Sequence, residues 1–230
     1  LPLPTKYCSV HGLNFSHVGK QCKVALSSPP TFTPQALIFD CDGTVLDTME
    51  WYYPSWETVC NKYNIDFSRK KFYSLAGVPV ANIFATILEE QNITHVSITT
   101  LMEEKHAIVE EQRHTSVPGR IECVCDIVRA NHGRLKMAIA SSGHKQNVLE
   151  GLKENDMFKY FDAVVTHEDV PEGKNKPAPD IFLLAAKQLG VDPTLCRGFE
   201  DADVGMASLR AAGMDACDVR KMKDYPHKFD

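Results

Sequence analysis

The chain lacks any long apolar segment. A helix needs about eighteen or more consecutive apolar residues to cross a bilayer, and the longest runs here, such as Ala36 to Phe39, have only the length of strands. An excess of basic residues is also missing, since the formal net charge is -5. Proteins dedicated to nucleic-acid binding are usually basic over their binding domain. These absences exclude a membrane span of ordinary type and disfavour general nucleic-acid binding.

Cysteine is present but scattered, with eight residues in a chain of 230. This excludes a small disulfide scaffold, because a chain of this length can form a hydrophobic core without covalent staples. A composition of 43% hydrophobic and 24% charged residues is that of an ordinary globular protein. We therefore expect a cytoplasmic monomer. The sequence begins at Leu1 and does not decide whether a leader precedes it.

From Gln35 onward, short apolar runs alternate with helical patterns. The apolar runs predict five strands, at residues 36–39, 137–140, 161–166, 196–199 and 215–219. The helical patterns lie at residues 122–131, 144–155, 180–189 and 202–212. Strands that alternate with helices indicate a parallel sheet covered on both faces. The predicted fold class is α/β, a Rossmann-like, doubly wound parallel sheet.

Residues 48–117 interrupt this alternation, because they contain helical patterns and no convincing strand. The block is either extra core or a small helical cap that acts as a lid, and we favour the cap, because both its ends return beside one acidic loop. Residues 27–34 (SSPPTFTP) are typical of a linker, and we expect no regular strand or helix before it. The expected domains are a tail and linker at 1–34, a catalytic core at 35–47 and 118–230, and the cap at 48–117.

Reactive side chains follow the ends of the predicted strands. Asp40 and Asp42 follow the first strand, Ser141 the second, and Glu200 with Asp201 the fourth, while Lys176 lies in the loop after the third. Ligands of open parallel sheets bind at the carboxyl ends of the strands. A carboxylate-rich site with one cation and one hydroxyl is suited to phosphoryl transfer with a divalent metal.

Each residue type fits a role in that chemistry. Asp40 is the candidate nucleophile and Asp42 the candidate general acid and base. Asp40, Asp42, Asp201 and Glu200 are candidate ligands of Mg²⁺, which prefers oxygen ligands. The candidate phosphate binders are the Lys176 ammonium, the hydroxyls of Thr44 and Ser141, and the backbone amides of Ser142 and Gly143. Taken singly, each could equally be an ordinary loop or cap residue.

Four segments carry a family resemblance: LIFDCDGTVLDT (37–48), IASSG (139–143), KPAPDIF (176–182) and FEDADVGMASLRAAGM (199–214). In this order they resemble the four motifs of the haloacid dehalogenase superfamily, over residues 35 to 220. The helical insertion resembles the small cap of the subgroup that contains β-phosphoglucomutases and sugar-phosphate phosphatases, including fructose-1-phosphate phosphatases. The resemblance implies that Asp40 is the nucleophile and Asp42 the general acid and base. It also implies that Ser141 and Lys176 bind phosphate and that Asp201 is a magnesium ligand.

Two cap positions bear on the choice between phosphatase and mutase. By the same resemblance, mutases commonly carry a histidine where this chain has Tyr52. They also carry an arginine in a cap loop. The corresponding loop here, residues 75–82, contains no basic residue. Both differences favour hydrolysis. Lys105 is a second candidate for substrate specificity; its alternative is a surface charge that pairs locally. The predicted function is Mg²⁺-dependent hydrolysis of a small phosphorylated metabolite, with a phosphomutase as the alternative.

The N-terminal segment contains Cys8, His11, His17 and Cys22. These residue types at this density suit a small zinc site. The segment resembles the zinc knuckle of retroelement nucleocapsid proteins, although His11 stands where that motif has a cysteine and the central gap is one residue longer. Zn²⁺ is therefore a second expected cofactor, the alternative being an unstructured tail. Nucleic acid is a candidate partner through residues 6–23 alone, and a nucleic-acid-binding protein with a dormant catalytic domain is a further alternative.

Overall fold

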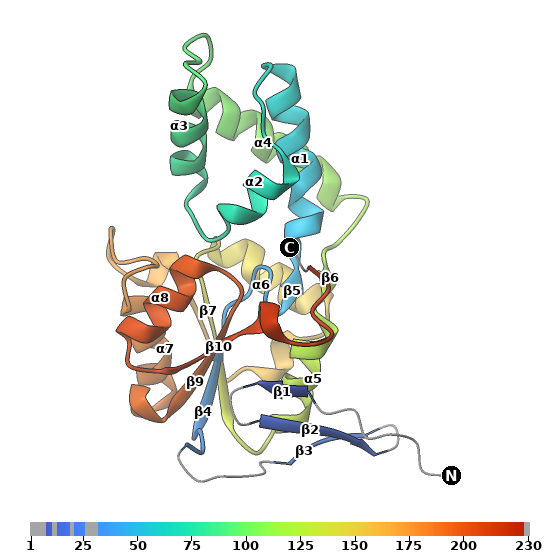
Figure 1. Ribbon diagram of the computed structural model, residues 1–230, viewed down its shortest axis with the longest axis vertical. Coiled ribbons are helices and arrows are strands. Elements are labelled where there is room, and N and C mark those ends of the chain that lie inside the picture. Colours follow the sequence, from blue (N-terminus) through green and yellow to red (C-terminus); the bar gives the residue numbers. More distant parts are fainter. Residues whose placement is uncertain (1–7, 11–12, 19–20, 26–31, 228–230) are drawn as a thin grey trace. The chain divides into compact units, whose positions relative to one another are not determined.

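The computed structural model describes residues 8–10, 13–18, 21–25 and 32–227. The described chain divides into two compact units (Figure 1). One contains the described residues up to Leu46 together with those from Arg120 onward, and the other is Asp47–Gly119. None of the helices in these described ranges has both the length and the apolar character that a membrane span requires.

A five-stranded sheet forms the centre of the first unit, with strand order β10-β9-β4-β7-β8. Its strands are β4 (Ala36–Phe39), β7 (Lys136–Ser141), β8 (Ala163–Thr166), β9 (Cys196–Glu200) and β10 (Asp215–Asp218). All neighbouring pairs are parallel. The chain builds outward from β4 on one side and then crosses to the other, so the strand order reverses beside β4. The predicted strands and the doubly wound fold class are confirmed.

Side chains that alternate along β4 face two different hydrophobic layers. Leu37 and Phe39 pack with helices α5 (Glu122–Asn131) and α6 (Lys145–Glu154). Ala36 and Ile38 pack instead with the helices on the opposite face.

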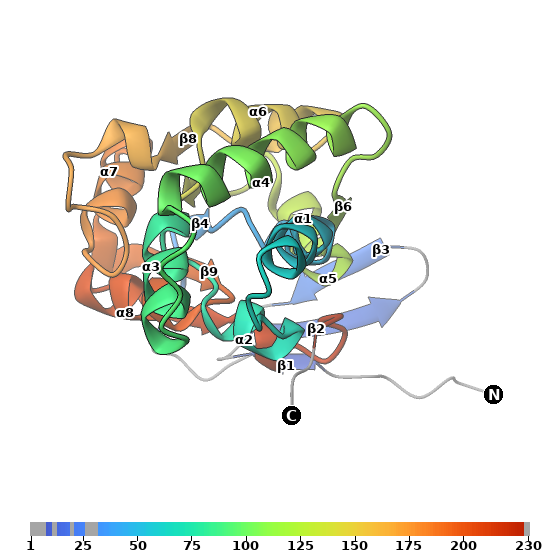
Figure 2. The ribbon, with the colours of Figure 1, turned by 90° about the horizontal axis from the view of Figure 1, so that it is seen from above.

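The helices of that opposite layer are α7 (Asp180–Leu189) and α8 (Asp203–Ala211). Figure 2 shows these two pairs of helices on different sides of the sheet. Gly190 ends α7 in the left-handed conformation, with φ of 67°, as a glycine helix stop does. The predicted helices are present, and both faces of the sheet are covered.

The second unit is helical. It contains α1 (Thr48–Lys62), α2 (Arg69–Ser74), α3 (Val80–Glu90) and α4 (Ile98–Arg113). Helices were expected throughout this block, although α2, with six residues, is too short to show a helical period in the sequence. Its core is aromatic: the Trp56 ring lies 4.6 Å from Phe84 and 5.2 Å from Phe67. Two-residue strands β5 (Leu46–Asp47) and β6 (Gly119–Arg120) pair where the chain enters and leaves this unit.

The N-terminal segment corrects one expectation. Instead of an unpatterned tail, it forms an antiparallel sheet of β1 (Cys8–Val10), β2 (Leu13–Val18) and β3 (Gln21–Ala25). Hairpin strands are held by hydrogen bonds between backbone groups. Such pairing does not require apolar alternation in the sequence, which explains why the pattern gave no strand signal.

Candidate active site

The carboxyl ends of β4, β7 and β9 bring the predicted residues to one edge of the sheet. Asp40 directly follows β4, Ser141 ends β7 and Glu200 ends β9. The backbone N–H of Asp40 donates to the carbonyl of Phe199 at 2.9 Å, and the rings of Phe39 and Phe199 stack at 4.6 Å. The nucleophile candidate is therefore fixed to the neighbouring strand through its own backbone.

Lys176 reaches this edge from the loop between β8 and α7. Its ammonium donates to Asp40 Oδ1 at 2.5 Å and to Glu200 Oε2 at 2.7 Å, and its side chain is 2% exposed. Burial lowers the pKa of a lysine, but the charges of Asp40 and Glu200 more than reverse this, so the pKa of Lys176 is raised. Lys176 is a fixed cation that holds two strand ends together.

One buried ammonium does not balance the carboxylates around it. Burial, followed by the charge of Asp40, raises the pKa of Glu200 to about 7. Burial and the charges of Glu200 and Asp40 likewise raise the pKa of Asp201 well above its usual value. Three buried carboxylates share one ammonium, so a surplus of negative charge remains that a metal cation would offset.

The arrangement of oxygens fits a hard divalent cation. Asp40, Glu200 and Asp201 each offer one carboxylate oxygen, and these three atoms lie within 4.8 Å of one another. Asp40 Oδ2 is buried and finds no hydrogen-bond partner among the described residues. An unsatisfied buried carboxylate oxygen is costly, and coordination of Mg²⁺ would satisfy it. The side chain of Asp42 is not part of this group.

Two glycines make room for the carboxylates. A Cβ atom on Gly43 would lie 2.3 Å from Asp201 Oδ2, and one on Gly205 would lie 2.0 Å from the Glu200 side chain. Gly43 also has a φ of 82°, which L side chains rarely adopt. Glu200 is further held by the N–H groups of Asp201 and Ala202, which donate to its Oε1 at 3.1 and 3.0 Å. Any side chain larger than hydrogen at Gly43 or Gly205 would therefore displace the carboxylate that packs against it.

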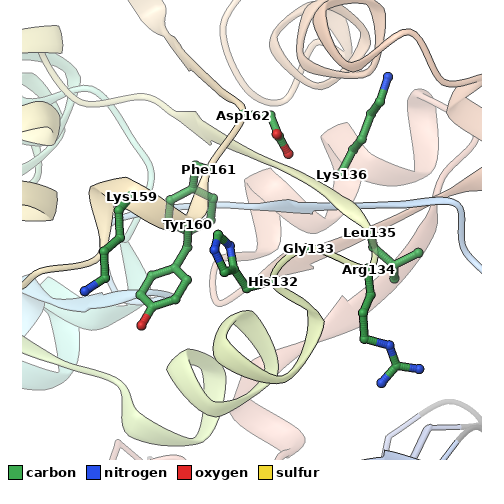
Figure 3. Close-up of a pocket in the computed structure, with 9 residues that line it drawn as sticks. All are labelled: His132, Gly133, Arg134, Leu135, Lys136, Lys159, Tyr160, Phe161 and Asp162. Carbon is green, nitrogen blue, oxygen red and sulfur yellow. The ribbon is translucent and has the colours of Figure 1, made fainter.

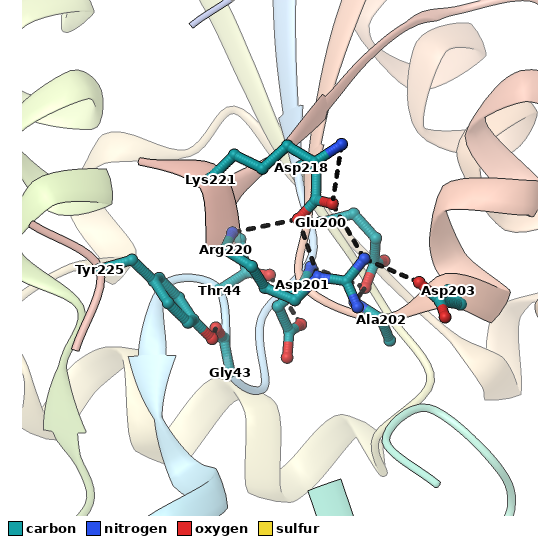
Figure 4. Close-up of polar contacts among 10 residues, drawn as sticks. All are labelled: Gly43, Thr44, Glu200, Asp201, Ala202, Asp203, Asp218, Arg220, Lys221 and Tyr225. Atoms are coloured by element: carbon teal, nitrogen blue, oxygen red, sulfur yellow. Dashed lines mark hydrogen bonds and ion pairs between the residues drawn. The ribbon is translucent and has the colours of Figure 1, made fainter. Parts of the chain in front are cut away.

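Hydroxyl groups fix the remaining positions of this loop (Figure 4). The Thr44 hydroxyl is fully buried and donates to Asp201 Oδ1 at 3.1 Å, so in this structure it orients a carboxylate; its predicted phosphate-binding role stays a prediction. The Tyr225 hydroxyl donates to the carbonyl of Gly43 at 2.7 Å. Tyr225 lies outside the four motifs, and no sequence signal marked it.

A charged network supports the start of α8 from the C-terminal segment. The Arg220 guanidinium donates to Asp218 Oδ1 and Oδ2 at 2.8 and 2.9 Å and to Asp203 Oδ1 at 2.7 Å. Figure 4 shows these contacts beside Glu200 and Asp201. Because Asp203 and Arg220 are partly exposed to water, we assign this network a positioning role and little stability.

Asp42 faces the phosphate-loop candidates. Its Oδ2 accepts from the Ser141 hydroxyl at 3.2 Å, and the Ser141 oxygen accepts from the Gly143 N–H at 2.9 Å. The hydroxyl of Ser142 is buried and has no hydrogen-bond partner among the described residues, so it is a further candidate donor for a ligand. Asp42 thus contacts the phosphate-loop candidates, and its side chain is not in the group of three metal-ligand candidates.

The two cap candidates also lie together. The Lys105 ammonium lies 5.1 Å from the ring centroid of Tyr52 and 5.1 Å from that of Trp56. Burial lowers the pKa of Lys105 to about 8. Within the described residues, the Lys105 ammonium therefore lies over aromatic rings, and it is not the locally paired surface charge of the alternative.

The N-terminal zinc candidates are only partly described. Cys8 lies in β1, while His17 in β2 and Cys22 in β3 are opposite one another in the strand register. His11 lies outside the described residues. Zinc binding by these four residues stays a prediction.

One pocket, of about 300 Å³, lies where β7 and β8 begin, at the opposite end of these strands from Ser141 (Figure 3). It contains none of the predicted site residues. Figure 3 shows that the side chains of Arg134, Lys136 and Lys159 point in different directions. The cations around this pocket do not converge on one ligand.

Comparison with known proteins places the chain in a family. Residues 37–219 match the family model described as haloacid dehalogenase-like hydrolase. The chain therefore belongs to the haloacid dehalogenase-like hydrolases, and the predicted family is confirmed.

Named relatives support the predicted class of enzyme, a phosphatase. The chain is 40% identical to the fructose-1-phosphate phosphatase YqaB of Escherichia coli, over 80% of this chain and 95% of that protein. It is 30% identical to the β-phosphoglucomutase of Bacillus subtilis, over 80% of this chain and 83% of the relative. Among solved structures, β-phosphoglucomutase from Clostridium difficile aligns with a TM-score of 0.63 and 29% identity, over 80% of this chain and 83% of that chain.

Proposed function

We propose that this protein is a Mg²⁺-dependent phosphatase that hydrolyses a sugar monophosphate through a phosphorylated Asp40. The observation that carries the proposal is the buried arrangement at the ends of β4 and β9. There, three carboxylate oxygens lie within 4.8 Å of one another, and the Lys176 ammonium is 2.5 Å from Asp40 Oδ1. The resemblance to a fructose-1-phosphate phosphatase supports a sugar phosphate as the substrate class.

The reaction has two steps. A carboxylate oxygen of Asp40 attacks the phosphorus atom, the bond from phosphorus to the ester oxygen breaks, and protonated Asp42 gives its proton to the leaving alkoxide. Asp42 then takes a proton from water, whose oxygen attacks phosphorus. The acyl-phosphate bond breaks, which releases inorganic phosphate and restores the Asp40 carboxylate.

The other residues bind and orient. Lys176 neutralises charge on the phosphoryl oxygens, and Ser141, Ser142 and the Gly143 N–H are the donors available for them. Asp40, Glu200 and Asp201 would hold Mg²⁺, which, when bound, supplies charge stabilisation to the transferring phosphoryl group. Asp42 would take part as acid and base, and its role as a metal ligand stays a prediction.

A panel of hexose, pentose and nucleotide monophosphates, assayed for phosphate release with and without Mg²⁺, tests this function. We expect release from at least one hexose phosphate, loss of activity in Asp40→Asn and Asp42→Asn, and unchanged activity in Asp66→Asn. Asp66 is an exposed aspartate of the helical unit and serves as the matched control. Full activity in Asp40→Asn, or no release from any substrate, would refute the proposal.

A phosphomutase is the second candidate, because a β-phosphoglucomutase is among the 30% identical relatives. The experiment that separates the two is product analysis with β-glucose 1-phosphate. A phosphatase releases phosphate and glucose, whereas a mutase yields glucose 6-phosphate. Tyr52, whose ring is occupied by the Lys105 ammonium, supports hydrolysis, because a phenol does not supply the protonated imidazole expected at this position in a mutase.

We also propose a cytoplasmic, monomeric enzyme whose partner is its small phosphorylated substrate. Support for a reducing compartment comes from the scattered spacing of the cysteines, which does not indicate a disulfide framework. Nucleic-acid binding through residues 6–23 stays a separate prediction. The complete set of catalytic residue types disfavours a dormant catalytic domain.

A further inference from the structure

A second group of candidate metal ligands lies beside the phosphate loop. It consists of His144, His167 and Glu168, which each offer one ligand atom, all within 4.8 Å of one another. His144 is the N-cap residue of α6, directly after Gly143. The other two begin a short 3₁₀ turn after β8, His167–Asp169. None of these three residues was predicted to be a ligand, because only the fold brings their two loops together.

The contacts of His167 prepare it for a metal. Its Nδ1 lies 2.9 Å from the carbonyl oxygen of Gly143. A carbonyl can only accept, so Nδ1 carries the hydrogen and Nε2 keeps its lone pair. Metal-bound histidines usually donate their other ring N–H to a carbonyl or carboxylate in this way. The backbone thus fixes both the tautomer and the orientation of the ring.

His144 and Glu168 have the separation of two ligands of one ion. His144 Nδ1 donates to Glu168 Oε1 at 3.3 Å, and a bound metal ion would replace the hydrogen between these two atoms. Two ligands at about 2.0 Å from a tetrahedral zinc ion are about 3.3 Å apart. The N–H of Lys145 donates to Glu168 Oε1 at 3.0 Å, which fixes the orientation of this carboxyl group.

The surroundings leave the site accessible. The side chain of His144 is 74% exposed and that of Glu168 is 47% exposed. The ammonium of Lys145, the residue after His144, is paired with Asp169 Oδ1 at 2.8 Å. The two imidazole rings lie 4.7 Å apart, nearly perpendicular. An ion can reach this cluster from solvent without any unfolding of the core.

We propose that His144, His167 and Glu168 form a binding site for a divalent transition-metal ion of the zinc class, with a fourth position open to water. Two imidazoles and a carboxylate are ligands that zinc prefers, whereas magnesium prefers oxygen alone. The site is therefore chemically distinct from the group of Asp40, Glu200 and Asp201. It adjoins Gly143, whose carbonyl and N–H link it to the loop proposed to bind phosphate.

Cobalt(II) is the probe of choice, because tetrahedral cobalt with nitrogen and oxygen ligands absorbs in the visible range. The experiment uses the full chain with saturating Mg²⁺ to fill the carboxylate site. A background of Cys8→Ser with Cys22→Ser removes any thiolate site, which would otherwise add sulfur-to-cobalt charge-transfer bands in the near ultraviolet. We expect one equivalent of cobalt to give visible bands, and zinc to displace it.

Variants decide whether the bands come from this site. His167→Ala should abolish the visible bands. Glu168→Gln should weaken cobalt binding at least tenfold. The glutamine keeps a side-chain oxygen that can accept from the Lys145 N–H. His95→Ala, at an exposed histidine of the helical unit, should leave the spectrum unchanged. Far-ultraviolet circular dichroism checks that each variant folds. If folded His167→Ala and Glu168→Gln keep the full spectrum, or if no cobalt binds, the proposal is wrong.

Discussion

Each unit of the molecule contains a lysine that is largely removed from water, and the two lysines differ in their partners. Both ammonium groups lie over aromatic rings: Lys176 is 4.9 Å from the centroid of Phe182, and Lys105 is 5.1 Å from that of Tyr52. Two carboxylates also hold Lys176, and its pKa is raised. For Lys105, burial alone lowers the pKa to about 8.

The comparison shows that burial does not by itself decide the charge of a lysine. Aromatic faces attract a cation by about 0.5–2 kcal/mol, which is not enough to offset its lost hydration. Carboxylates in direct contact with the ammonium do offset its lost hydration, as at Lys176. Lys176 is therefore a permanent cation for phosphate, whereas Lys105 is a lysine that loses its proton within the range of mildly alkaline pH.

The largest expected effect comes from Lys176→Met. Activity should fall by at least about 10²-fold, because a cation aimed at the phosphoryl group is lost. The free energy of unfolding should fall by about 3 kcal/mol, because Asp40 and Glu200 are left buried without their partner. Phosphate release and urea denaturation measure the two effects. Lys105→Met is the matched control, and an equal loss of stability in both variants would break the comparison.

Gly43→Ala should be nearly as damaging to activity. The new methyl group would collide with Asp201 Oδ2, and displacement of a reacting group by about 1 Å can cost about 10²-fold in rate. The control is Gly133→Ala, which shares a positive φ of 72° but has open space around it. That variant should lose about 1 kcal/mol of stability through backbone strain alone and keep its activity. Equal activity in the two variants would contradict the steric argument.

The pH dependence of stability tests Lys105. Its pKa of about 8 in the folded chain is lower than the value of about 10.4 in an unfolded chain. Between these values the unfolded state binds more protons, so stability rises with pH. Between pH 8 and 10, the free energy of unfolding of the wild type should rise by on the order of 1 kcal/mol relative to that of Lys105→Met. Urea denaturation at each pH measures this difference. Parallel curves for the two proteins would show that Lys105 is not desolvated.

Tyr225→Phe has the smallest expected effect. The variant keeps the buried ring and removes only the hydroxyl that donates to Gly43, so about 1 kcal/mol of stability should be lost. Because Gly43 packs against Asp201, we also expect a higher Mg²⁺ concentration for half-maximal activity. Tyr160→Phe is the control, at a half-buried tyrosine that lies away from the carboxylates. An unchanged requirement for Mg²⁺ in Tyr225→Phe would remove the positioning role.

The sequence by itself determined the order of strands and helices, the α/β class, and the residues at the strand ends. These follow from local patterns: short apolar runs, helical periods, and acidic residues that directly follow buried strands. Asp40, Ser141 and Glu200 could be assigned to one edge because parallel strands bring their carboxyl ends together. The N-terminal strands escaped because they are held by backbone pairing that needs no apolar alternation, and α2 escaped because its six residues are too few to show a helical period.

Only the tertiary structure decided how the site is held. It pairs Lys176 with two carboxylates from different strands, turns Thr44 toward Asp201, and brings Tyr225 to Gly43. It also assembles His144, His167 and Glu168. Apart from the neighbours His167 and Glu168, these contacts join residues at least 23 positions apart, so no local pattern encodes them. The opposite pKa shifts of the two lysines have the same origin, because charge and solvation depend on neighbours that only the folded chain provides.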